Sequence, residues 1–182
     1  MSLKQSISRS RNCLFLICPT DHIEGVVTQI YGEKAYFYTA LGANFCWDVR
    51  TQKSILELIE NRNIEQIVFL TKCSNLFYKK VTVPEQKLQL SYPIGQTLQK
   101  LDKTLPHGFL SQSHFIMRIM LLASRHLQEQ HRHILKTSIL GRSLKKKFVS
   151  INEFVYYSET GIFYSPQSIE KQILLHSTQS LN

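Results

Sequence analysis

The apolar run CLFLIC at residues 13–18 is followed directly by PTDH at residues 19–22, and this junction decides the fold. A short continuous apolar run that stops at a proline-containing turn is typical of a strand buried on both faces. Such strands belong to parallel sheets, in which helices cover both faces. The sequence therefore predicts an open α/β sheet. It also predicts that the Cys18 thiol lies at the carboxyl end of a strand, where α/β folds place ligands and catalytic groups.

The segments that follow alternate between helical and extended patterns. We expect a short helical segment at 23–31, a strand at 35–39, an amphipathic helix at 50–62 and a strand at 66–71. Right-handed crossovers between successive strands place these strands parallel in one sheet, with helices packed on its faces. The prediction is a β-α-β-α-β unit in which the second and third strands lie on either side of the first.

Prolines interrupt the middle of the chain, and the regular pattern then returns. Within residues 76–113 only 96–103 has a helical pattern. Apolar residues at helical spacing predict a helix packed on the core at about 114–135, with Ser113 as its N-cap.

The last third of the chain predicts a closing hairpin. Aromatic and β-branched residues favour strands at 148–157 and 162–164, which the turn SETG joins. We expect one domain across residues 1–182, with its core at 12–165 and a terminal helix and tail at 166–182.

Composition favours a cytoplasmic protein with reduced thiols and no membrane partner. Hydrophobic residues make up 43% of the chain, and no apolar run approaches the roughly 20 residues that span a bilayer. Residues 1–12 lack the apolar stretch of a signal peptide. The four cysteines form no CxxC pair, which favours free thiols over disulfides. The net charge of +9 would attract anionic partners over long range.

Five stretches of the sequence carry a resemblance to a known family. They are LFLIC at 14–18, residues 32–42, IEQIVFL at 64–70, residues 114–122 and FVYYSETGI at 154–162. In this order they resemble the first strand with its zinc-binding cysteine, the second strand and its loop, the third strand, the long helix and the Tyr-Asp-x-x-Thr-Gly hairpin of the β-class carbonic anhydrases. The resemblance implies a central, mostly parallel sheet flanked by helices, with a C-terminal antiparallel hairpin or edge strand. It also implies a homodimer, the usual assembly of the family.

The zinc ligands that the resemblance implies are only partly present. The family holds Zn²⁺ with two thiolates and an imidazole, so that the metal lowers the pKa of a bound water. Cys18 matches the first cysteine, but Lys72 and Asn75 stand where the family has the His-x-x-Cys ligands. An ammonium group repels a dication, and a neutral amide is a poor substitute for a thiolate.

The neighbouring motif of the family is also altered. Its C-x-D-x-R pattern aligns with CPTDH at residues 18–22, so Thr20 and His22 replace the aspartate and the arginine. A slip of one residue would bring Asp21 into the aspartate's place, but the arginine would still be missing. We therefore expect no zinc-dependent hydration of carbon dioxide and no cofactor. The candidate residues of the crevice are Cys18, Thr20, Asp21, His22, Lys72 and Asn75.

Two other interpretations of the crevice stay open, a displaced zinc site and a site for a small anionic ligand. Cys18, His22 and Cys73 would form a displaced zinc site if the two strand ends converge, as in a divergent zinc lyase of the carbonate dehydratase type. Lys72 in the same crevice would favour a small anionic ligand. Cys18 as a nucleophile has less support, because no oxyanion donors or orienting group can be identified.

A further alternative is a basic face on the long helix. Arg118, Arg125 and Arg132 recur at helical spacing, and such a strip would bind phosphates or other anions. Nucleic acid is not favoured as the partner. The sequence has no helix-turn-helix pattern, no aromatic stacking motif and no zinc finger.

Overall fold

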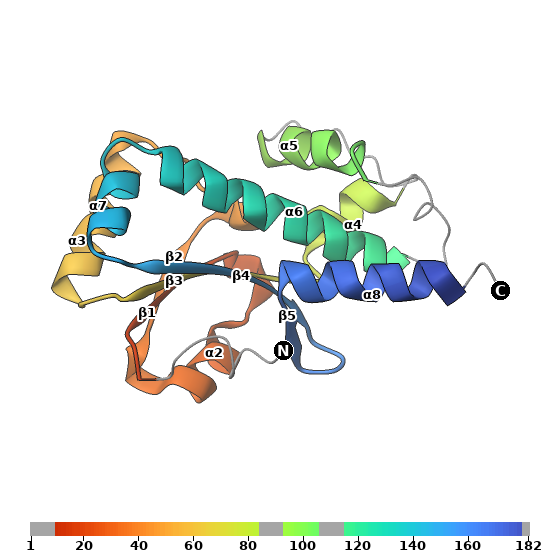
Figure 1. Ribbon diagram of the computed structural model, residues 1–182, viewed down its shortest axis with the longest axis horizontal. Helices are drawn as coiled ribbons and strands as arrows, with labels where there is room; N and C mark the ends of the chain where they lie inside the picture. Colours follow the sequence, from red (N-terminus) through yellow and green to blue (C-terminus); the bar gives the residue numbers. More distant parts are fainter. Residues whose placement is uncertain (1–9, 84–92, 106–114, 180–182) are drawn as a thin grey trace.

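In the described part of the chain, five strands form one central sheet, in the order β2-β1-β3-β4-β5 (Figure 1). The structure, a computed structural model, describes residues 10–83, 93–105 and 115–179. The strands are β1 (Cys13–Ile17), β2 (Ala35–Thr39), β3 (Gln66–Lys72), β4 (Ser150–Tyr157) and β5 (Ile162–Tyr164). The first four are parallel, and β5 pairs antiparallel with β4. The predicted sheet is therefore confirmed, with β2 and β3 on either side of β1 and the hairpin at one edge.

Helices cover the two faces of this sheet unequally. The α-helices of the described residues are α2 (Glu24–Tyr31), α3 (Val49–Asn61), α4 (Leu76–Thr82), α5 (Pro93–Asp102), α6 (Phe115–Lys136), α7 (Leu140–Lys146) and α8 (Pro166–Gln179). Short 3₁₀ turns occur at η1 (Pro19–Asp21), η2 (Gly32–Lys34) and η3 (Leu41–Ala43). Helix α2 lies on one side of the sheet, while α3, α6 and α7 lie on the other (Figure 1). None of the described helices combines the length and apolar character that a bilayer crossing requires.

Alternation along β1 divides the core into two apolar clusters. Leu14 and Leu16 belong to the larger cluster, on the side of α6, and Phe15 and Ile17 belong to the smaller one, with Val27 of α2. These side chains are fully buried. Burying one large apolar side chain contributes about 1.5–3 kcal/mol to folding. Both faces of β1 are therefore apolar, which explains the uninterrupted hydrophobic run in the sequence.

Two short helices, α4 and α7, were not expected from the sequence. Their first turns are held by side chains. Asn75 accepts a hydrogen bond from the backbone N–H of Phe77 at 2.9 Å and caps α4. Gln52 of α3 accepts from the backbone N–H groups of Ile139 and Leu140 at the start of α7. Helices of seven residues are too short to be stable alone, so their presence depends on such contacts.

Other differences from the expected elements concern their ends. The strand expected from 148 begins at Ser150, because Phe148 adopts a left-handed φ of 53° and is 91% exposed. The helix expected at 96–103 starts earlier, at Pro93, where proline suits a first turn. The expected N-cap Ser113 lies outside the described residues.

Candidate functional site

The expected crevice lies where β1 and β3 end, next to the turns η1 and η3. Asp21 in η1 is its central polar group and is only 2% exposed. One carboxylate oxygen accepts hydrogen bonds from the Thr71 hydroxyl at 2.8 Å and the Lys72 backbone N–H at 2.9 Å. The other accepts from the Asn75 side-chain amide at 2.6 Å. Asp21 therefore ties η1 to the end of β3 and to the start of α4.

The electrostatics of Asp21 reflect competing effects. Burial raises the pKa of its carboxyl above the usual value, because it penalises the charged form. The three hydrogen bonds and the positive charge of Lys72 oppose that shift. Since all three partners donate, the arrangement suits an ionised carboxylate whose acceptor capacity is used inside the protein.

Cys18 is fully buried and is held by a different set of contacts. Its sulfur accepts a hydrogen bond from the backbone N–H of Gly42 at 3.1 Å and lies 3.0 Å from the Thr20 hydroxyl oxygen. Gly42 has a φ of 64°, a left-handed conformation that glycine adopts without strain. The thiol thus fastens the loop after β2 to the end of β1.

The structure does not bring the residues of the displaced zinc site together. His22 is exposed, whereas Cys73 is 2% exposed. Burial raises the pKa of the Cys73 thiol to about 11, so this group is a neutral thiol near neutral pH. Among residues 10–83, 93–105 and 115–179, no three His, Cys, Asp or Glu side chains form a group that could hold a metal ion.

The family's own ligand positions do not fit zinc either. At position 75 the side-chain nitrogen donates to Asp21, and the side-chain oxygen accepts from Phe77. The Lys72 side chain ends in an ammonium group, which has no lone pair with which to bind a metal. Besides the exposed imidazole of His22, the crevice therefore offers a metal ion one thiol, that of Cys18, and one carboxylate, that of Asp21, which is already hydrogen-bonded.

Below the crevice lies a buried polar pair that the sequence interpretation missed. Tyr78 of α4 and His126 of α6 are both fully buried, and the Tyr78 hydroxyl lies 3.0 Å from Nδ1 of His126. Within the described residues, Nε2 of His126 has no hydrogen-bond partner. Burial lowers the pKa of His126 to about 4 and raises that of Tyr78. The signal was available: His126 follows Leu122 by four residues and so falls on the apolar face of the helix.

We expect acid to destabilise the protein through His126. His126 takes up a proton near pH 6.5 in the unfolded chain but only near pH 4 in the folded chain. Between these two pH values, unfolding is therefore accompanied by the uptake of one proton. The free energy of unfolding should therefore fall as pH falls, by about 2 kcal/mol between pH 7 and pH 5. Urea titrations at several pH values measure this slope.

The double variant His126→Leu/Tyr78→Phe removes both polar groups of this pair and should flatten the slope. The matched control is His22→Asn, since His22 is exposed and asparagine tolerates its left-handed backbone. If the control flattens the slope as much as the double variant does, His126 is not the responsible group.

The basic face expected on the long helix is largely neutralised. Arg118 forms two hydrogen bonds with Asp102 of α5, at 3.0 and 2.6 Å, and both side chains are mostly buried. Arg125 pairs with Glu170 of α8 at 3.5 Å. Arg132 is exposed, and its Nε donates to the backbone oxygen of Gln128. Two of the three arginines therefore connect α6 to neighbouring helices.

Solved structures of β-class carbonic anhydrases resemble this chain. CafD from Aspergillus fumigatus matches with a TM-score of 0.70 and 17% identity, over 90% of this chain and 94% of that one. A structure from work on two tetrameric β-carbonic anhydrases of Sordaria macrospora matches with a TM-score of 0.70 and 8% identity, over 87% of this chain and 81% of that one. No family model matches the sequence, and no curated protein does. The chain has the β-carbonic anhydrase fold.

Proposed function

We propose that this chain is a carbonic-anhydrase-like protein that does not hydrate carbon dioxide through zinc. The observation that carries the proposal is the position of Asn75. It stands where the family supplies a thiolate, and both polar ends of its amide are already hydrogen-bonded inside the protein. Asp21, the carboxylate that a one-residue slip would bring beside the metal position, accepts three hydrogen bonds. These hydrogen bonds then hold the turn after β1 to the end of β3, and a bound dication would have to break them.

The test compares metal content and catalysis in protein purified without chelators. We expect substoichiometric zinc by elemental mass spectrometry and no carbon dioxide hydration above the buffer rate in a stopped-flow assay. Zinc at one ion per chain, together with turnover that Cys18→Ala abolishes, would overturn the proposal. That result would favour the divergent zinc lyase instead.

A variant with restored ligands provides the positive control for metal uptake. Lys72→His with Asn75→Cys recreates the family's His-x-x-Cys spacing beside Cys18, and three such ligands suit a catalytic zinc site. We expect this variant to retain more zinc than the wild-type protein does when both are purified in parallel. Equal zinc in the two proteins would mean that positions 72 and 75 do not decide metal binding.

We also propose that the protein is a cytoplasmic homodimer. The Sordaria macrospora neighbours are described as tetrameric, which supports self-association of this fold. Sedimentation velocity over a range of concentrations measures the assembly directly.

A further inference from the structure

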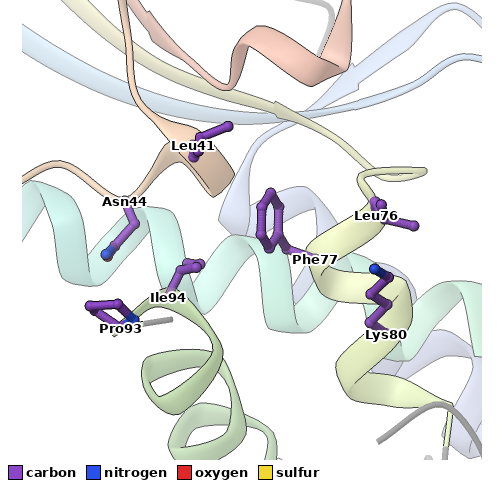
Figure 2. A pocket seen from close by; sticks show the side chains of 7 residues that line it. All are labelled: Leu41, Asn44, Leu76, Phe77, Lys80, Pro93 and Ile94. Carbon is purple, nitrogen blue, oxygen red and sulfur yellow. The ribbon is translucent and has the colours of Figure 1, made fainter. Parts of the chain in front are cut away.

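A cavity of about 490 Å³ opens beside the crevice, between η3, α4 and the start of α5. Apolar side chains form most of its wall: Leu41, Leu76, Phe77 and Ile94 (Figure 2). Leu41 and Leu76 are 61% and 54% exposed, so two large apolar groups of one cavity face water. Cavities of about 300–1,000 Å³ with apolar walls and a few polar groups are typical binding sites for small molecules.

One polar group of the cavity is the side-chain amide of Asn44, whose orientation follows from its neighbours. The side-chain oxygen of Gln130 accepts a hydrogen bond from the backbone N–H of Phe45 at 3.1 Å. Its side-chain nitrogen is therefore the atom that donates to the Asn44 oxygen, also at 3.1 Å. This leaves the NH₂ group of Asn44 pointing toward Pro93 (Figure 2). The cavity wall thus offers a hydrogen-bond donor.

The other polar group is the ammonium of Lys80, which comes from α4 on the opposite side of the cavity (Figure 2). Lys80 is partly buried, and no carboxylate in the described part of the chain forms an ion pair with it. A cation beside an apolar cavity attracts an anion more strongly than a fully hydrated surface cation does, because less water screens the charge. Both polar groups that line the described wall are donors, so they suit a ligand with acceptor groups.

We propose that this cavity binds an organic carboxylate with an apolar body, such as an aromatic acid. Its carboxylate would pair with Lys80, its body would cover Leu41, Leu76 and Phe77, and an acceptor at its far end would reach Asn44. A second copy of the chain fits less well. If the twofold axis of a dimer passed through the cavity, it would bring two Lys80 groups together, and the lining residues include no carboxylate to pair with them.

The test uses 6-hydroxynaphthalene-2-carboxylate, whose hydroxyl oxygen supplies the far acceptor, and its uncharged analogue 6-hydroxynaphthalene-2-carboxamide as probes, with titration calorimetry as the measurement. We expect the carboxylate to bind more tightly than the amide. Lys80→Met should weaken carboxylate binding about tenfold, the effect of losing one charge-assisted contact, and leave amide binding unchanged. The matched control is Lys79→Met, because Lys79 precedes Lys80 on α4 and does not line the cavity.

A second variant tests the apolar wall. Leu76→Ser should weaken both probes to a similar extent, since it removes apolar contact without changing charge, and thermal unfolding confirms that the variant is folded. Equal affinity for the two probes, no binding of either, or equal effects of the two lysine variants would overturn the proposal. So would loss of carboxylate binding with rising protein concentration, which would indicate that a second copy covers the cavity. These residues are not those of the zinc test, so failure here leaves the proposed function unaffected.

Discussion

Replacing Gly141 by alanine should lower the free energy of unfolding by about 3 kcal/mol or more, near the upper end of overpacking effects. A β-carbon at this position would lie 2.5 Å from the backbone oxygen of Leu135 and 2.8 Å from that of Ile134. Both oxygens belong to the last turns of α6, so neither can move aside as a flexible side chain could. The N–H of Gly141 also donates to the Thr137 hydroxyl at 2.8 Å, which holds the turn tightly.

Urea denaturation measures this loss, and Gly25→Ala is the matched control. Gly25 lies in α2 and has no heavy atom within 4 Å of an added β-carbon. Alanine favours helix there, so the control should leave stability unchanged or raise it by up to about 1 kcal/mol. Similar losses in the two variants would show that the close approach of α7 to α6 is not the cause.

Replacing Asp21 by alanine should cost about 3–4 kcal/mol, the second large effect. The variant leaves three donors without an acceptor: those of Thr71 and Asn75, which are buried, and the backbone N–H of Lys72, which is partly buried. Each such donor costs about 1–3 kcal/mol, and loss of the buried charge offsets part of the sum. Because Asn75 caps α4, hydrogen exchange should also increase at the start of that helix.

Two further variants test this interpretation of Asp21. Asp21→Asn keeps one acceptor oxygen for Thr71 and Lys72 but turns an NH₂ group toward the Asn75 donor, so its stability should fall between those of the wild-type protein and Asp21→Ala. The comparison variant is Asp48→Ala. Asp48 is an exposed aspartate at the start of α3, and it accepts a hydrogen bond from the backbone N–H of Thr51 at 2.7 Å. Its loss should lower the free energy of unfolding by about 1 kcal/mol. If Asp21→Ala costs no more than Asp48→Ala, the hydrogen bonds of Asp21 do not hold the crevice together.

Much of the fold could be predicted because its signals are local. The apolar run of β1 is continuous, and β2 lies at Ala35–Thr39, the expected range. The stripe on α6 repeats at helical spacing over 22 residues. No comparable local pattern marks helix α7, because its start depends on Gln52, which is far away in the sequence. The side-chain oxygen of Gln52 accepts hydrogen bonds from the N–H groups at the start of the helix. Such a contact forms only after the chain has folded.

For the crevice, the sequence indicated which residues lie near one another but not which of their atoms are in contact. Strand ends placed Cys18, Asp21 and Asn75 near one edge of the sheet, and the structure joins Asp21 to Asn75 by a hydrogen bond. It gives Cys18 other partners, Thr20 and Gly42, and leaves His22 exposed. Strand order sets which segments meet, but side-chain direction and turn geometry decide which atoms touch.

The sequence by itself determined the parallel sheet, its hairpin edge and the amine and amide at the two ligand positions, because apolar periodicity and residue chemistry belong to the chain. Only the tertiary structure decided that Asp21 clamps β3 to η1, that His126 meets the Tyr78 hydroxyl, and that Asn44 and Lys80 share one apolar cavity. These features depend on distances between segments remote in sequence, and packing alone sets those distances.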